Sequence, residues 1–218
     1  MHCGRDCSWK SCPGFGALHR GLDRVDQGQI HLDGHAIHTA REAQLAELRR
    51  SRLSLVFQQF HLISTLTVLD NIRFQAALCG RFDPAYEAEL IDRLGLVEQT
   101  AKYPQQLSRG QQQRVAIARA LALRPQVLIC DESVSMLDAE IQAEVLALLR
   151  RLQQDLGLAM IFVTHDLSVA SGFCHRVIVL DHGHVVEEGP GDRLLRQPQA
   201  TITRTLVEAC PLLPTSNS

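Results

Sequence analysis

The stretch that decides the fold is Leu107–Asp138, LSRGQQQRVAIARALALRPQVLICDESVSMLD. A polar turn that contains a glycine, Ser108–Gln111, opens a predicted helix. A short apolar run, Val127–Cys130, predicts a buried strand, and two carboxylates, Asp131 and Glu132, follow it directly. Because side chains at the carboxyl end of a strand can reach a ligand in the crevice there, this pattern favours a site for phosphate and magnesium.

Residues on either side of this stretch predict alternating strands and helices. Strands are predicted at 29–32, 53–57, 159–163, 176–180 and 184–187, and the all-apolar run 159–163 is of the kind buried on both faces of a parallel sheet. Helices are predicted at 40–50, 68–78, 84–94, 110–123, from residue 139 onward, near 192–196 and at 201–209. The block from 61 to 124 is largely helical and lies between strands, which predicts a helical subdomain inserted in an α/β core.

Bulk properties exclude several classes of protein. The chain has 218 residues and a net charge of −2, so it is long enough for a substantial core and has no basic excess that would indicate nucleic-acid binding. No apolar run approaches the roughly 20 residues that span a bilayer. Seven cysteines without a CxxC pair are typical of reduced thiols in a cytosolic protein. The histidines at 31, 35 and 38 lie across a predicted strand and turn, and we interpret them as surface residues.

The ordered set of motifs resembles the ATPase subunit of ABC transporters. LSRGQ at 107–111 is similar to the LSGGQ signature, VLICDE at 127–132 to the Walker B strand with its catalytic glutamate, and SMLD at 135–138 to the D-loop. The resemblance extends from about Val25 to about Pro211. It implies an α/β P-loop NTPase core of the ABC ATPase type, with a mainly parallel sheet, an inserted helical subdomain and the N-terminal strands missing.

The same resemblance implies limits for the parts of the chain. Residues 1–22 would be a degenerate N-terminal segment with a remnant of the phosphate-binding loop, and residues 23–211 the ABC ATPase domain. The helical subdomain would occupy about 61–124, and residues 212–218 would be a tail.

The resemblance assigns catalytic roles to residues that follow predicted strands. Asp131 would hold Mg²⁺ directly or through water, and Glu132 would polarise the water that attacks ATP. Gln58 matches the Q-loop glutamine, which meets magnesium and senses the membrane partner, and His165 matches the H-loop histidine, which contacts the γ-phosphate and orients the water. Each has a structural alternative: an acidic pair at a strand end, a glutamine of no special role, and a histidine that caps the next helix.

The signature and D-loop residues would act across a dimer. Ser108, Gly110 and Gln111 would touch the γ-phosphate of ATP held mainly by a second subunit, although Ser108 and Gln111 also satisfy a capping box that needs no ligand. Asp138 would bridge the two sites, or serve only as a helix N-cap. Arg109 replaces the first glycine of the family, and its side chain would either crowd the dimer interface or add positive charge toward phosphate.

The phosphate-binding loop is the part of the pattern that departs from the family. A Walker A motif reads GxxxxGK[ST], and the only candidate is Gly4–Ser11, GRDCSWKS. Lys10 would neutralise phosphate charge and the Ser11 hydroxyl would bind magnesium, but Trp9 stands where the motif requires glycine. A non-glycine residue at a positive φ costs about 1–2 kcal/mol, and the indole would occupy space that the phosphates need.

Two explanations for this departure stay open, an N-terminally incomplete member of the family and a segment 1–22 that is read out of frame. Under either explanation we expect the polypeptide to bind ATP weakly or not at all. The alternative to a working ATPase is therefore a catalytically impaired remnant. A soluble ABC protein of repair or translation is disfavoured, because the chain has no tandem second cassette, coiled-coil insertion or basic patch.

The resemblance also suggests cargo and partners. The C-terminal stretch, with VVEEGPGDRLLRQPQ at 185–199, resembles the peptide and nickel importer branch, whereas the segment after Gln58, QFHLISTLTVLDNI, is more similar to lipoprotein-release or amino-acid transporter ATPases. We expect ATP and Mg²⁺ as ligands, and integral membrane permeases and a second ABC ATPase, in a homo- or heterodimer, as partners, without nucleic acid. The expected location is the cytoplasmic face of the cell membrane, and peptide or nickel import is the favoured activity.

Overall fold

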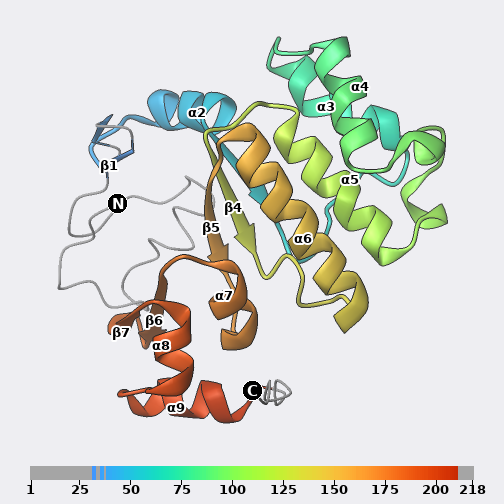
Figure 1. Cartoon of the computed structure of the whole chain (residues 1–218). Helices are drawn as coiled ribbons and strands as arrows, with labels where there is room; N and C mark the ends of the chain where they lie inside the picture. The colour runs from blue at the N-terminus through green and yellow to red at the C-terminus, as the bar shows by residue number, and fades with distance from the viewer. Residues whose placement is uncertain (1–30, 33–34, 37, 211–218) are drawn as a thin grey trace. The chain divides into compact units, whose positions relative to one another are not determined.

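The computed structural model describes residues 31–32, 35–36 and 38–210, which Figure 1 draws as helices and strands. The chain divides into two compact units, one of residues 47–163 and the other of residues 1–46 with 164–218. The described residues do not include the predicted segment 1–22, with Lys10 and Ser11, or the tail 212–218. The prediction that the N-terminal strands are missing also concerns residues outside this range. The predicted domain limits stay a prediction.

A parallel sheet forms the centre of the unit 47–163. Among the described residues it has three strands, in the order β3 (Leu53–Val56), β4 (Val127–Asp131) and β5 (Ala159–Val163). The eighteen-residue helix α6 (Ala139–Leu156) connects β4 to β5, as a crossover between parallel strands requires. Figure 1 labels α6 and the two strands that it connects.

Most helical elements of this unit lie between β3 and β4 in the chain. They are α3 (Val68–Leu78), α4 (Pro84–Arg93), the short 3₁₀ helices η1 (Val97–Gln99) and η2 (Pro104–Gln106), and α5 (Arg109–Leu121). Helix α5 packs against α3, α4, α6 and β3, so it joins the helical elements to the sheet. Most of its residues from Val115 to Leu121 are buried.

Side-chain caps determine where these helices begin. Thr67, Asp83, Ser108 and Asp138 each accept a hydrogen bond from a main-chain N–H in the first turn of the helix that follows. Such caps satisfy N–H groups that have no partner inside the helix. Helix α6 ends at Gly157, whose φ of 63° is the left-handed conformation that glycine adopts at little cost.

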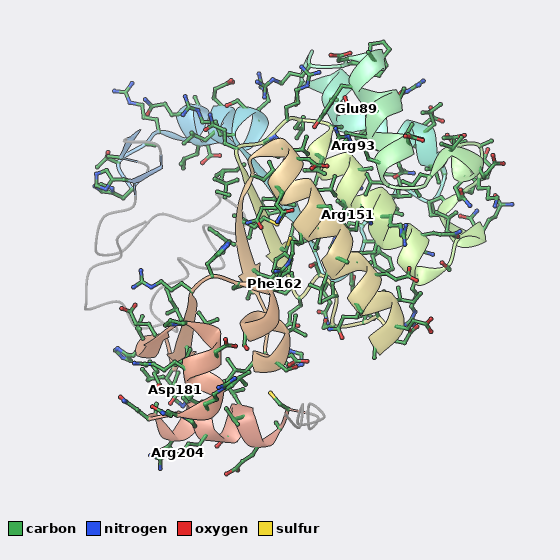
Figure 2. The ribbon with its side chains drawn as sticks, in the orientation of Figure 1. Glu89, Arg93, Arg151, Phe162, Asp181 and Arg204 are labelled. Atoms are coloured by element: carbon green, nitrogen blue, oxygen red, sulfur yellow. The ribbon has the colours of Figure 1, made fainter. Side chains whose placement is uncertain are left out.

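Apolar side chains from the sheet and helices form the core of this unit. Helix α6 contributes the buried side chains of Val145, Leu148, Leu149 and Leu152. At the surface, Arg93 of α4 forms ion pairs with Glu89 of its own helix (2.7 Å) and with Asp155 of α6 (2.9 Å). Figure 2 labels Arg93 and Glu89 on α4 and Arg151 on α6.

The other unit contains the short pair β1 (His31–Leu32) and β2 (His35–Ala36), and the C-terminal elements. These are α7 (Leu167–Phe173), the antiparallel pair β6 (Val177–Asp181) and β7 (His184–Gly189), α8 (Gly191–Arg196) and α9 (Thr201–Glu208). Its core contains buried residues of α7, β6 and α8: Leu167, Ala170, Val177, Val179 and Leu194. Helix α2 (Glu42–Ser51) carries the chain from one unit into the other.

Over the described residues, the predicted helices and strands agree with the structure to within two or three residues, but the burial of β5 was predicted wrongly. Its residues are exposed or half-buried, Phe162 among them (Figure 2). Among the described residues β5 pairs with β4 alone, so it is an edge strand of the three. An all-apolar run therefore indicates a strand of a parallel sheet more reliably than it indicates burial on both faces.

Candidate functional site

The predicted catalytic residues of the unit 47–163 lie at the end of the parallel sheet where the carboxyl ends of its strands meet, which we call the carboxyl edge or sheet edge. In the register of the strands, Val56 of β3 is opposite Cys130 of β4, and Asp131 is opposite Val163 of β5. Gln58, two residues beyond β3, and Glu132, directly after β4, therefore follow the carboxyl ends of neighbouring parallel strands. Ligands of open α/β sheets bind in the crevice outside these ends.

Glu132 has an unusual main-chain conformation. Its φ is 47°, in the left-handed region that is uncommon for residues other than glycine. Its N–H donates a hydrogen bond to the carbonyl of Val163 (2.9 Å), so the turn after β4 is tied to the end of β5. Strained backbone of this kind clusters at functional sites, and nothing in the sequence signals it.

A serine links the two predicted catalytic residues of this unit. The side-chain amide of Gln58 donates to Ser135 Oγ (3.2 Å), and Ser135 Oγ donates to the main-chain carbonyl of Glu132 (2.8 Å). The structure thus brings Gln58 and Glu132 together. Sequence reasoning missed Ser135, which belongs to the predicted D-loop and is separated from Gln58 by 77 residues.

The signature turn has the predicted capping box. Ser108 Oγ accepts from the N–H of Gln111 (3.3 Å), and the Gln111 side chain accepts from the N–H of Ser108 (3.0 Å). These bonds account for the start of α5 without a ligand. The remaining first-turn N–H groups leave the helix terminus able to face an anion, so the structural and functional interpretations are compatible.

A hollow of about 420 Å³ lies where the signature turn meets the start of α6. Gly110 approaches α6 so closely that an added Cβ would stand 2.7 Å from Ile141 Cγ2. The Arg109 guanidinium donates to the main-chain carbonyl of Met136 (3.2 Å). The hollow is lined by Ser108, Arg109, Gly110, Met136, Leu137, Asp138 and Ile141.

Asp138 is the N-cap of α6, because its Oδ1 accepts from the N–H of Ile141 (3.0 Å). The structural interpretation of Asp138 is therefore confirmed, and its predicted role across a dimer stays a prediction. Its exposed position on the wall of the hollow is compatible with both.

His165 belongs to the other unit, two residues beyond β5, and its side chain is exposed. Its position relative to Gln58 and Glu132 stays a prediction. The alternative that it caps the next helix is wrong, because Asp166 does so. Asp166 Oδ1 accepts from the N–H groups of Ser168 (2.9 Å) and Val169 (3.3 Å) at the start of α7.

The residues at the sheet edge fit magnesium in their chemistry. Asp131 offers a half-buried carboxylate and Gln58 an amide oxygen, and Mg²⁺ prefers such hard oxygen ligands. Mg²⁺ in nucleotide sites is held by one or two protein groups together with phosphate and water, so a cluster of three protein ligands is not required. Lys10 and Ser11, the other half of the predicted site, lie outside the described residues.

A family model and several relatives match the chain. The model described as "ABC transporter" matches residues 17–135. The methionine import ATP-binding protein MetN of Caulobacter vibrioides is 44% identical over 195 residues, which cover 87% of this chain and 58% of that protein. MetN of Mesorhizobium japonicum is 42% identical over 198 residues, covering 89% of this chain and 54% of that protein.

Solved structures match over most of the chain as well. An ATP-binding cassette solved as a dimer in a post-hydrolysis state with ADP and Pi has a TM-score of 0.72 at 29% identity, covering 87% of this chain and 88% of that one. The cbiO1 protein from Clostridium perfringens, part of the ABC transporter complex cbiONQ, has a TM-score of 0.76 at 29% identity, covering 85% and 74%.

Three further observations concern the length of the relatives, the cargo in their names, and the helices of this chain. The chain spans a little over half the length of these two MetN relatives. They are named for methionine import and do not support the predicted peptide or nickel branch. Among the described helices, none combines the length and the apolar character needed to cross a bilayer.

Proposed function

We propose that this chain, which belongs to the ABC transporter family, is the ATP-binding and ATP-hydrolysing subunit of an importer. The predicted fold class is confirmed as the ABC ATPase fold, with a parallel sheet and packed helices. The observation that carries the proposal is the hydrogen-bonded link from Gln58 through Ser135 to Glu132 at the carboxyl edge of the sheet.

The proposed mechanism assigns one task to each residue at this edge. Mg²⁺, when bound, would neutralise the charge of the transferred phosphoryl group, and Asp131 and Gln58 would hold it together with Ser11. Glu132 would orient the attacking water and accept its proton. The strained turn at Glu132, tied to β5 by its N–H, would keep the carboxylate in place before the substrate arrives, which lowers the cost of reorganisation.

The hollow at the signature turn would be the surface that faces a second ATPase subunit. Ser108, Gly110 and Gln111 would contact the γ-phosphate of ATP bound mainly by that subunit, and Asp138 would approach the partner's site. The solved cassette dimer supports this assignment by its likeness in fold. Integral membrane permeases would be the other partners, which would place the chain at the cytoplasmic face of the cell membrane.

For the cargo we propose methionine or a closely related amino acid. The names of the MetN relatives support this choice. The segment after Gln58, which resembles lipoprotein-release or amino-acid transporter ATPases, is compatible with it. Peptide or nickel import rests on the C-terminal stretch alone and takes second place.

Steady-state ATP hydrolysis tests the enzymatic part of the proposal. Three proteins are compared: the chain itself, Trp9→Gly, and Trp9→Gly with Glu132→Gln. We expect hydrolysis to be weak in the first, clear in the second and absent in the third. Silence in all three, with Trp9→Gly folded by circular dichroism, would contradict the proposal and favour an impaired remnant.

Uptake of labelled compounds tests the cargo. The Trp9→Gly chain is produced in three strains, which lack the ATPase of a methionine, a dipeptide or a Ni²⁺ importer but keep the matching permease. Uptake of methionine, a dipeptide and Ni²⁺ is measured side by side, with Glu132→Gln as the control. Methionine uptake restored alone supports the assignment, and restored uptake of the dipeptide or Ni²⁺ would reverse it.

A further inference from the structure

The segment between β3 and α3, residues 57–67, carries Gln58 and is fixed at its C-terminal half by Asn71. The buried Asn71 side chain donates to the carbonyls of Ile63 (3.0 Å), Leu66 (3.1 Å) and Thr67 (2.9 Å). Its amide oxygen accepts from the N–H of Ile63 (2.8 Å). This half of the segment therefore depends on the helix that directly follows it.

The N-terminal half is held by a residue that is distant in sequence, Arg119 of α5. Arg119 Nη1 donates to the carbonyl of His61 (2.6 Å), and Nη2 donates to the carbonyl of Phe60 (2.9 Å). One guanidinium thus binds two consecutive carbonyls, so it fixes their direction as well as their distance. Its planar fork suits such a paired contact better than a lysine ammonium does.

The segment needs such support because its backbone turns sharply at His61. The φ of His61 is 46°, a left-handed conformation that costs energy for a residue other than glycine. The ring of His61 meets that of Phe57 edge-on, with centroids 4.9 Å apart. Chain held in this way can keep the neighbouring Gln58 side chain against Ser135 Oγ.

Partial burial of the charged Arg119 side chain costs solvation free energy, which an apolar residue packed at this position would not lose. Arg119 is half-buried, and desolvation lowers its pKa below the ordinary arginine value. Both of its acceptors among the described residues are neutral carbonyls, whereas Arg114 on the same helix pairs with the carboxylate of Glu144. A partly buried cation is retained at a cost in solvation, which is understandable if it fixes the geometry of a site.

We propose that Arg119 is a positioning residue, which holds the segment 57–63 so that Gln58 stays at the sheet edge beside Ser135. Helix α5 begins at the signature turn and carries Arg119 near its other end, so the same helix joins the hollow to the segment that carries Gln58. For the roles of Gln58 and of the signature turn, this inference rests on the proposed function. The contact itself does not.

Fluorine NMR of the full chain, labelled with 4-fluorophenylalanine, tests the contact without nucleotide. Phe57 and Phe60 report on the segment, and Phe82 and Phe162 report on the rest of the unit. The variants are Arg119→Gln, Arg119→Lys, and the matched control Arg114→Gln on the same helix. Substitution of each of these four phenylalanines by tyrosine assigns its signal.

In Arg119→Gln we expect the Phe57 and Phe60 signals to move toward their positions in the unfolded chain, while Phe82 and Phe162 stay. Arg119→Lys should give an intermediate shift, and Arg114→Gln should leave Phe57 and Phe60 unchanged. Unchanged Phe57 and Phe60 signals in Arg119→Gln would overturn the proposal. So would a common shift of all four signals, which would indicate a general structural role.

Kinetics of the Trp9→Gly protein separate this inference from the proposed function. If that protein hydrolyses ATP, Arg119→Gln should lower kcat while KM for ATP changes less than about twofold, because a displaced Gln58 affects the transition state more than binding. A rise in KM at constant kcat would contradict the link to Gln58. If Trp9→Gly is inactive, the proposed function fails, and the fluorine spectra still decide whether Arg119 positions the segment.

Discussion

The guanidinium of Arg109 donates a hydrogen bond to the main-chain carbonyl of Met136, 3.2 Å away. The first residue of α5 is thereby joined to the segment that precedes α6. Arg109 was predicted either to crowd a dimer partner or to add positive charge toward phosphate. The Arg109 side chain contacts Met136 of the same chain and lines the hollow, so its positive charge lies at the wall of the hollow. Its effect on a dimer partner stays a prediction.

Arg109→Ala should change the free energy of unfolding by less than about 0.5 kcal/mol. The exposed hydrogen bond to Met136 contributes about 0.5–1.5 kcal/mol. Its loss is offset because a positive charge at a helix N-terminus is unfavourable by about 0.3–1 kcal/mol. Urea unfolding followed by circular dichroism measures the difference. A loss well above 1 kcal/mol would mean that Arg109 stabilises the fold.

Gly110→Ala should destabilise the chain by about 1–3 kcal/mol, because the new Cβ would stand 2.7 Å from Ile141 Cγ2. The clash involves the packing of α5 on the start of α6, and it cannot be relieved by a flexible side-chain end. Truncation of Ile141 to alanine removes the clashing atom. The double variant should therefore be more stable than the sum of the single effects predicts, as a urea-unfolding double-mutant cycle measures.

Asp138→Ala should cost about 1 kcal/mol, because α6 loses the cap on the N–H of Ile141. Asp138→Asn is the informative variant, since asparagine caps helices about as well as aspartate does. Stability near that of the wild type is expected for it. If Asp138 also acts across the dimer, ATP hydrolysis by the Trp9→Gly protein should fall in Asp138→Asn. Unchanged hydrolysis in Asp138→Asn would mean that Asp138 serves only as the N-cap of α6.

The local features of the stretch 107–138 could be predicted from the sequence. The capping box of Ser108 and Gln111, the strand before Asp131 and the cap at Asp138 each depend on residues a few positions apart, and all are present. Their order along the chain was enough for the family resemblance, which the family match supports.

The contacts that assemble the site could not be predicted in this way. Gln58 and Ser135 are 77 residues apart, and Arg119 reaches carbonyls 58 and 59 residues away. Such contacts follow from strand order and helix packing, which a pattern of apolar residues does not specify. The left-handed conformation of Glu132 could not be predicted either, because glutamate is not a residue type that indicates a positive φ.

Glu187, in the C-terminal elements, should make the stability of the chain depend on pH. Its buried carboxylate accepts from the N–H groups of Ala200 (3.1 Å) and Gln199 (3.1 Å), just before α9, and from Arg193 (3.3 Å). The N–H of Ala200 is the largest cause that lowers the Glu187 pKa below its usual value of 4.5, and burial partly opposes it.

A carboxyl group with a lowered pKa stabilises the fold when it is ionised. Its contribution is full above the unfolded pKa and is lost as the pH falls through the folded pKa. Glu187→Gln cannot ionise, so its deficit relative to the wild type should be largest near pH 7 and should shrink as the pH falls below 4.5. Urea unfolding at pH values from neutral to acid, with the exposed Glu208→Gln as the control, measures this deficit. A deficit that stays constant with pH would mean that Glu187 acts through packing rather than charge.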